Sequence, residues 1–299
     1  WYTGSGIYRD VYLIVEKKKA PNLLKIETIS FDPAMISVTT ESGCEIGITD
    51  SEGNFVMGQI MKENDNESSN LVNYLITIPN AKLWSAEYPY LYTCQVTRGG
   101  EELSSTFGIR KLEWSAQKGL LINGERVLLR GGCIHHDNGV LGACAYADAE
   151  ERRVRILKEA GYNAIRSAHN PMSRAMLDAC DRLGMYVIDE CFDGWYTPKT
   201  YHDYSRYFNE CWRDDLKTMV EKDFNHPCVI MYSIGNEVLE TSTDKGVETC
   251  RILKDYVNDL DSSRPITAGI NVLLNVYAKN GIGIYKEKGN YEQKPITTK

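Results

Sequence analysis

From residue 109 onward, the chain alternates short apolar runs with amphipathic helical patterns, and this alternation constrains the fold more than any other feature. Strands are predicted over residues 163–167, 185–188, 228–232 and 265–270, and helices over about 148–160, 208–224 and 245–260. Asp148 is the predicted N-cap of the first helix, and Asn170 with Pro171 is predicted to begin another helix, which ends before Gly184. Repeated strand–helix units predict a parallel sheet covered by helices.

Polar or ionisable residues follow four consecutive predicted strands, namely the apolar run that begins at Val127 and the first three strands given above. These are His135-His136-Asp137, Arg166 with His169-Asn170, Asp189-Glu190, and Asn236-Glu237. A barrel gathers the carboxyl ends of all its strands around one mouth, whereas an open sheet offers only a crevice at its switch point. The distribution of polar residues therefore favours a TIM-type barrel with its chemistry at that mouth.

The part of the chain before residue 109 has a different character. Residues 22–108 contain runs rich in β-branched and aromatic residues, such as 34–39, 71–78 and 90–97, separated by polar and glycine turns. About 90 residues with several short strands predict a β-sandwich of immunoglobulin type. Residues 1–16 predict one further strand, whose partners we expect upstream of this chain or in the next domain.

Composition excludes several classes of function. The 299 residues contain 34 Lys and Arg against 41 Asp and Glu, a formal net charge of −7, and no basic run, which argues against nucleic-acid binding. No apolar stretch approaches the ~20 residues that a membrane span needs. The nine cysteines lack CxxC pairs and zinc-finger spacing, so we expect free thiols and a reducing compartment, with the cytoplasm favoured.

The carboxylates Glu190 and Glu237 suggest general acid–base chemistry. Glycoside hydrolysis needs one protonated and one ionised carboxyl group across the scissile bond. Asn236, beside Glu237, can hydrogen-bond a sugar hydroxyl. Trp195, with Tyr196 and Tyr201 in the same loop, offers a flat face for a sugar ring, although packing within the loop explains these aromatic residues equally well.

Two other classes of function remain open at this point. A metal-dependent hydrolase could use the following residues as ligands: His135, His136, His169, Asp189 and Glu190. Against it, adjacent strand residues face opposite sides of a sheet, and no HxH or HExxH motif is present. The other class is a non-catalytic carbohydrate-binding or structural module.

Several motifs, in order along nearly the whole chain, resemble glycoside hydrolase family 2, the family of β-galactosidases, β-glucuronidases and β-mannosidases. They are Gly6-Ile7-Tyr8-Arg9-Asp10-Val11, Trp84–Tyr92, Phe107-Gly108-Ile109-Arg110, Arg130–His135, Arg166–Pro171, Asp189-Glu190, Asn225-His226-Pro227 and Ser233–Glu237. The stretches His135–Gly139 and Leu141-Gly142-Ala143 look most like the bacterial β-galactosidase branch.

The resemblance implies three domains: the last strand of a sugar-binding jelly roll over residues 1–16, an immunoglobulin-like sandwich over 17–108, and the N-terminal part of a (β/α)₈ barrel over 109–299. It implies a retaining exo-β-glycosidase, most simply a β-galactosidase acting on terminal β-D-galactosides, with β-glucuronidase or β-mannosidase as alternatives. A homo-oligomeric full-length protein is compatible with it.

The resemblance also implies residue roles. Glu237 corresponds to the acid/base, and Asn236 to the contact with the sugar 2-hydroxyl. His135, Arg166 and His169 match positions that line the sugar subsite, and Glu190 matches a supporting position.

This sequence departs from the family pattern in two places. Well-known β-galactosidases carry a Glu-x-His magnesium-binding pair shortly after the Asp-Glu, whereas this chain has Phe192-Asp193-Gly194-Trp195-Tyr196. We therefore expect no magnesium site of that kind and no other cofactor. The nucleophilic glutamate of the family lies near the end of the seventh barrel strand, and only about five strands can be placed here. We expect the nucleophile beyond Lys299 and an isolated chain without activity.

Overall fold

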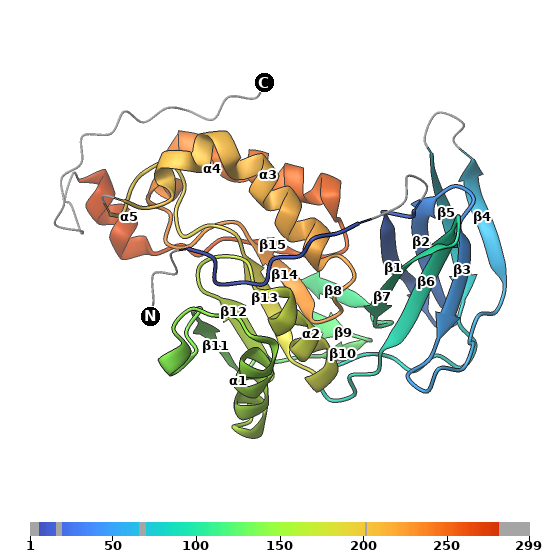
Figure 1. Ribbon diagram of the computed structural model, residues 1–299. Coiled ribbons are helices and arrows are strands. Elements are labelled where there is room, and N and C mark those ends of the chain that lie inside the picture. The colour runs from blue at the N-terminus through green and yellow to red at the C-terminus, as the bar shows by residue number, and fades with distance from the viewer. Residues whose placement is uncertain (1–5, 16–19, 66–69, 201, 281–299) are drawn as a thin grey trace.

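The computed structural model describes residues 6–15, 20–65, 70–200 and 202–280. These residues form a β-sandwich and a parallel sheet flanked by helices (Figure 1). No helix in the described ranges has the length and apolar character needed to cross a bilayer.

The sandwich packs a four-stranded sheet against a three-stranded one. Its strands are β1 (Leu24–Phe31), β2 (Ala34–Glu41), β3 (Glu45–Thr49), β4 (Ile60–Asp65), β5 (Leu71–Thr77), β6 (Tyr92–Arg98) and β7 (Glu101–Phe107). The sheet orders are β1-β2-β5-β4 and β3-β6-β7, which is the strand order that constant-type immunoglobulin domains have. Inward residues such as Ile36, Val38, Ile48 and Val96 are fully buried, as strand alternation requires.

A small antiparallel sheet follows the sandwich. It consists of β8 (Leu112–Ser115), β9 (Gly119–Ile122) and β10 (Glu125–Arg126). The turn between β9 and β10 is Asn123-Gly124, with φ of 56° and 84°, so both residues adopt the left-handed conformation that a tight hairpin turn needs. An Asn-Gly dipeptide is typical of such a turn, so the sequence itself indicates this hairpin.

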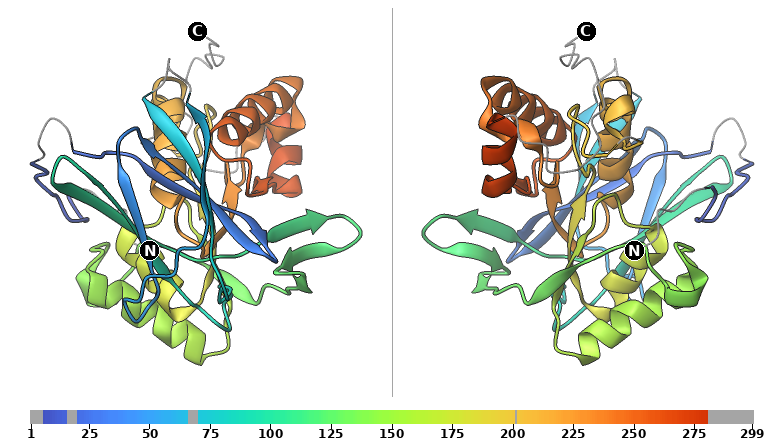
Figure 2. Two further views of the ribbon diagram at one scale, coloured as in Figure 1. Left: turned by 90° about the vertical axis from the view of Figure 1, so that its right-hand side faces the viewer. Right: turned by 90° about the vertical axis from the view of Figure 1, so that its left-hand side faces the viewer.

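The second part is a five-stranded, wholly parallel sheet in the order β11-β12-β13-β14-β15, an incomplete TIM barrel. Its strands are β11 (Gly131–Ile134), β12 (Ala164–Ser167), β13 (Tyr186–Glu190), β14 (Val229–Ser233) and β15 (Ile266–Thr267). The helices are α1 (Ala147–Glu159), α2 (Arg174–Leu183), α3 (Ser205–Asp223), α4 (Asp244–Leu260) and α5 (Val272–Lys279), with short 3₁₀ helices η1 (Gly139–Leu141) and η2 (Leu239–Ser242). In both views of Figure 2, α1 and α2 lie at the opposite end of the sheet from α3 and α4.

The amino end of β14 is held in place partly by the sandwich and by the segment that follows it. Asn225 accepts a hydrogen bond from Ile26 N at 2.9 Å and donates one to Leu24 O at 2.8 Å. Arg110 donates to the carbonyls of Pro227 (2.5 Å) and Val229 (2.7 Å). Burial, together with a neighbouring arginine, lowers the pKa of Arg110 to about 9. The sandwich is thus anchored at the start of the strand that carries the Asn-Glu pair.

Two predicted helix starts were wrong. Helix α1 begins after Tyr146, which makes no side-chain cap, so Asp148 is a residue of the first turn. Helix α2 is capped by Ser173, whose hydroxyl accepts a hydrogen bond from Met176 N at 3.1 Å. Asn170 and Pro171 instead belong to the loop after β12, where the Pro171 carbonyl accepts a hydrogen bond from another segment.

The strand predicted over residues 1–16 is not seen in its described part. Residues 6–15 join none of the sheets formed by the described residues. Arg9 Nη2 donates to Pro171 O at 2.5 Å, and Tyr8 O accepts from Ala145 N at 2.9 Å. The segment therefore lies against the loops of the barrel domain, and its assignment to a jelly roll stays a prediction.

Candidate active site

Glu190, at the end of β13, is the most buried charged group of the candidate site, with no exposed surface. Its Oε2 accepts hydrogen bonds from Arg166 Nη2 (2.5 Å), Arg166 Nε (3.1 Å) and Ser233 Oγ (2.5 Å). Its Oε1 lies 2.7 Å from His169 Nδ1. Because both oxygens are occupied by partners from the ends of β12 and β14 and from the loop after β12, Glu190 is placed to organise the site and not to attack a substrate.

Arg166 extends this network from Glu190 to Asn236. Its Nη2 also donates to Asn236 Oδ1 at 3.0 Å, and its Nη1 lies 3.2 Å from Cys133 Sγ. Burial alone would lower the pKa of Arg166, but the charge of Glu190 and the hydrogen bonds to it outweigh burial and raise that pKa. The guanidinium is therefore a fixed cation at the mouth of the barrel.

The orientation of the Asn236 amide follows from its two neighbours. A guanidinium can only donate and a carboxylate can only accept, so Oδ1 faces Arg166 and Nδ2 faces Asp193 Oδ1, at 2.9 Å. Among the described residues the second N–H of the amide has no acceptor, so it can donate to a sugar hydroxyl. The backbone N–H of Asn236 donates to Phe192 O at 2.9 Å, which ties this turn to the loop after β13.

Glu237 follows directly, in a backbone conformation that non-glycine residues rarely adopt. Its φ is 45°, and such conformations cluster at functional sites. The carboxyl group is more accessible than that of Glu190, with 37% of the side chain exposed. Oε1 accepts a hydrogen bond from Asn271 Nδ2 at 3.0 Å, and Oε2 lies 4.0 Å from Lys199 Nζ. A solvent-accessible carboxyl group held from both sides can transfer a proton to or from a bound substrate.

His135 and His169 lie together beside Glu190. Their rings meet edge to face, with centroids 5.2 Å apart and an interplanar angle of 90°. Burial and the neighbouring His169 lower the pKa of His135, which favours a neutral imidazole that can donate and accept hydrogen bonds. His169 also lines a cavity of about 410 Å³ with Tyr8, Arg9 and Asp193, so the N-terminal segment reaches the edge of the site.

Trp195 does not offer a face to a sugar, contrary to the prediction. The ring is fully buried, and its Nε1 donates to Ile234 O at 2.7 Å. A Cβ on Gly235 would lie 2.9 Å from Trp195 Nε1, so only glycine fits between the indole and the turn that carries Asn236. Trp195 therefore supports the turn from behind. Tyr196 is also nearly buried, and Tyr201 lies outside the described residues.

Sequence reasoning missed three contributors: Lys199, Asn271 and Ser233. Lys199 lies in the loop after β13, and its Nζ donates to Asp193 Oδ1 and to Asn236 O, both at 2.8 Å. Asn271 caps α5 through its Oδ1, which leaves its Nδ2 for Glu237. An Asn directly before an apolar helical pattern was the available signal for Asn271, whereas no local pattern identifies Lys199.

The residues named for a metal-dependent hydrolase do not converge on one point. Asp189 faces away from Glu190 and pairs with Lys222 Nζ at 3.2 Å, as strand alternation requires. His136 lies 3.3 Å from Arg9 Nη2. His169 and Glu190 contact each other, whereas Asp189 and His136 have other partners, so the named residues do not form one donor set.

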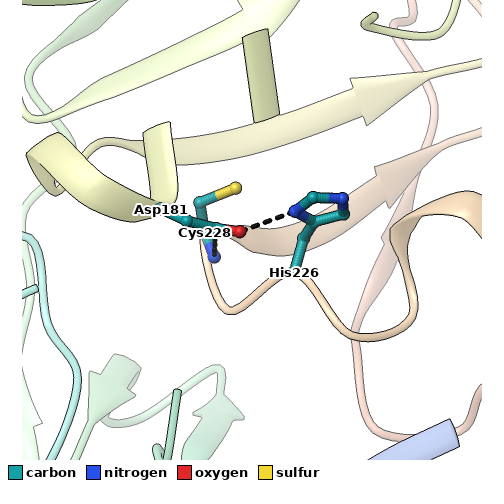
Figure 3. A group of neighbouring side chains, drawn as sticks. All are labelled: Asp181, His226 and Cys228. Carbon is teal, nitrogen blue, oxygen red and sulfur yellow. Dashed lines mark hydrogen bonds and ion pairs between the residues drawn. The ribbon is translucent and has the colours of Figure 1, made fainter. Parts of the chain in front are cut away.

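Elsewhere in the described ranges, a single group of three side chains could hold a metal ion: Asp181, His226 and Cys228 (Figure 3). The group lies before the amino end of β14, at the other end of the strand from Glu237. His226 Nδ1 lies 2.6 Å from Asp181 Oδ2, and Cys228 N donates to Asp181 Oδ1 at 2.9 Å. Burial and the charge of Asp181 raise the pKa of the Cys228 thiol well above its usual value, so the group is a hydrogen-bonded support for the His226-Pro227 turn.

Two family profiles match this chain. The profile described as "Glycosyl hydrolases family 2" covers residues 27–110, and "Glycosyl hydrolases family 2, TIM barrel domain" covers residues 115–297, more than half of the chain. The chain belongs to glycosyl hydrolase family 2.

Individual relatives of this family are named for different glycosidase activities. A β-galactosidase of Bacteroides ovatus is 35% identical, in an alignment that covers 91% of this chain and 38% of the relative. A putative β-glucuronidase of Formosa agariphila is 32% identical, in an alignment that covers 90% of this chain and 26% of the relative. A crystal structure of a family 2 member from Bacteroides cellulosilyticus superposes with a TM-score of 0.83, at 38% identity over 94% of this chain and 41% of that one. The chain thus spans about two fifths or less of these relatives.

Proposed function

We propose that the full-length protein is a retaining exo-β-glycosidase that hydrolyses terminal β-D-galactosides, with Glu237 as its general acid/base. The observation that carries the proposal is the Asn236-Glu237 pair at the end of β14. It combines, on the same turn, an accessible carboxyl group and an amide with one N–H that no described residue accepts.

In the proposed first step, Glu237 gives its proton to the glycosidic oxygen while a second carboxylate attacks the anomeric carbon from the other face. In the second step, the Glu237 carboxylate takes a proton from the water that releases the sugar. The free N–H of Asn236 would hydrogen-bond the 2-hydroxyl, a contact that strengthens in the transition state.

The second carboxylate is proposed to come from outside the described residues. Glu190 is unsuited to nucleophilic attack because it is fully buried and both of its oxygens hold hydrogen bonds. Its proposed role is to fix Arg166 and His169, which would line the sugar subsite together with His135. By resemblance to the family, the nucleophile is proposed to lie near the end of a later barrel strand than those described.

A galactoside is proposed over a glucuronide because of how the cations of the site are paired. A glucuronide carries a carboxylate, whose binding requires a cation with free hydrogen-bonding capacity. Arg166 is paired with Glu190 and Lys199 with Asp193, so both charges are already compensated. The family 2 relatives include proteins named for both activities, so this pairing is the argument that favours the neutral sugar.

The proposed reaction uses no magnesium ion at the loop after β13. The loop from Cys191 to Tyr196 contains one carboxylate, Asp193, and no imidazole. Asp193 Oδ1 accepts hydrogen bonds from Lys199 Nζ at 2.8 Å and from Asn236 Nδ2 at 2.9 Å. The donor set is therefore unsuited to the ion that the better-known β-galactosidases bind.

The experiment is an assay of the full-length protein against nitrophenyl β-D-galactoside, β-D-glucuronide and β-D-mannoside. We expect the highest kcat/KM for the galactoside. Hydrolysis of the glucuronide alone would overturn the choice of sugar, and the absence of hydrolysis of all three would overturn the proposed activity.

A further inference from the structure

The loop between β13 and α3 places a lysine ammonium in the interior of the site. Lys199 is only 8% exposed, although lysine side chains are seldom buried without a specific partner. Its backbone is held by Asp203, whose Oδ2 accepts from Lys199 N at 2.5 Å and from Thr200 N at 2.9 Å. The other oxygen of Asp203 accepts from Ser205 N at 3.1 Å, at the start of α3. The loop therefore fixes the position of Lys199, which differs in this respect from a mobile lysine on the surface.

The Lys199 ammonium connects three parts of the site that are separate in sequence. It donates to Asp193 Oδ1 and to the backbone carbonyl of Asn236, both at 2.8 Å. Glu237 Oε2 lies 4.0 Å from the same nitrogen. Asp193 in turn accepts from the Asn236 side chain at 2.9 Å, so Asn236 is held at its amide and at its carbonyl by one ion pair.

We infer that Lys199 is a positioning residue: its ammonium is an internal cation that fixes the Asn236-Glu237 turn, in a loop that lacks the Glu-x-His magnesium-binding pair. The inference rests on the proposed function of Glu237 as the acid/base. The ammonium fixes the peptide that joins the two functional residues and places one positive charge beside the Glu237 carboxyl group.

A purely structural ion pair between Lys199 and Asp193 is the competing explanation. Such a pair would connect two residues of one loop, six positions apart, and would require no contact with the next strand. The hydrogen bond to the Asn236 carbonyl and the proximity of Glu237 instead direct the lysine toward the residues of β14 that carry the proposed chemistry. The competing explanation predicts a loss of stability, and ours predicts a loss of turnover in a folded protein.

The test uses the full-length protein and three variants: Lys199→Met, Lys199→Arg and the double variant Asp193→Asn with Lys199→Met. The matched control is Lys217→Met, because Lys217 is a half-exposed lysine of α3 that pairs with Glu221, one turn further along the same helix. Each protein is assayed with phenyl and dinitrophenyl β-D-galactoside, in EDTA and in added MgCl₂, and its thermal unfolding is recorded.

For Lys199→Met we expect kcat on the phenyl galactoside to fall by ~10² or more, since that leaving group depends most on the proton donor. The loss on the dinitrophenyl galactoside should be smaller, and KM should change little. Lys199→Arg should recover part of the activity. The double variant, which removes the unpaired carboxylate, should stay as slow as Lys199→Met, and Lys217→Met should match the unmodified protein.

Several results would overturn the inference while leaving the proposed function intact. One is full activity of Lys199→Met, and another is a loss of kcat that is equal on both substrates and tracks the fraction of unfolded protein. Recovery of the double variant to the activity of the unmodified protein would also overturn it, as would a requirement of the unmodified protein for Mg²⁺. An unmodified protein that hydrolyses neither galactoside would instead overturn the proposed function.

Discussion

Replacing Arg166 with Met should both destabilise the barrel domain and slow the proposed reaction. The substitution removes two of the four hydrogen bonds that hold the Glu190 carboxylate and leaves those from His169 and Ser233. Breaking one partner of a buried ion pair costs about 3–5 kcal/mol of unfolding free energy. Because 23% of the Arg166 side chain is exposed while Glu190 is fully buried, we expect the lower end, about 3 kcal/mol.

That loss corresponds to a fall of about 6–12 °C in the unfolding temperature of a domain of this size. The same substitution releases Asn236 Oδ1 and lets the amide turn, so activity should fall even at temperatures where the variant is folded. The assay combines thermal unfolding by circular dichroism with kcat/KM for nitrophenyl β-D-galactoside and its 2-deoxy analogue. The loss of kcat/KM should be smaller for the analogue, which lacks the hydroxyl that Asn236 is proposed to bind.

The control is Arg182→Met, because Arg182 is a half-exposed arginine of α2 paired with Glu151, a type of pair that contributes about 0–1 kcal/mol. An Arg166→Met protein with the unfolding temperature of the control would refute the reasoning, since a buried Glu190 carboxylate would then have no need of its guanidinium partner.

Three further predictions concern pH, metal and the isolated chain. Burial and the charges of Arg9 and Arg153 lower the pKa of His136 from 6.5 to about 4, so the unfolded chain binds more protons than the folded chain between these pH values. The free energy of unfolding should therefore fall by up to ~3 kcal/mol as pH drops through that window. His136→Gln should flatten this pH dependence of stability, measured by denaturant unfolding. EDTA should leave the galactosidase activity of the full-length protein nearly unchanged, and a large loss restored by Mg²⁺ would contradict the proposed role of the loop after β13. The isolated 299-residue chain should not be labelled by a mechanism-based fluorinated glycoside, and labelling at Glu190 would show that the nucleophile lies within it.

The order and type of the main elements could be predicted from sequence because their patterns are local. Alternating strands, the Asn123-Gly124 turn and the parallel strands with polar residues at their ends all follow from short-range periodicity. The helix starts at α1 and α2 were wrong because two good capping residues, Asp148 and Asn170, lie near the real ones, and the path of the loop decides between them.

The candidate site was predicted in part, for a related reason. Strand ends brought Arg166, Glu190 and Asn236 together as expected, since the parallel sheet places them at one edge. Trp195 could not be placed correctly, because an aromatic residue in a loop has the same pattern whether it faces a substrate or packs behind a glycine. Lys199 was missed because its partners depend on the three-dimensional path of the loop, in which no spacing rule operates.

The most direct test of the central claim is the effect of Glu237→Gln in the full-length protein across a series of aryl β-D-galactosides. If Glu237 donates the proton to the leaving group, the variant should lose ~10³ or more in kcat/KM on the phenyl galactoside and about tenfold or less on the dinitrophenyl galactoside, which leaves without protonation. Added azide should then yield β-galactosyl azide, because the anion needs no general base. An equal loss on both substrates, with no azide product, would contradict the assignment of Glu237 as the acid/base.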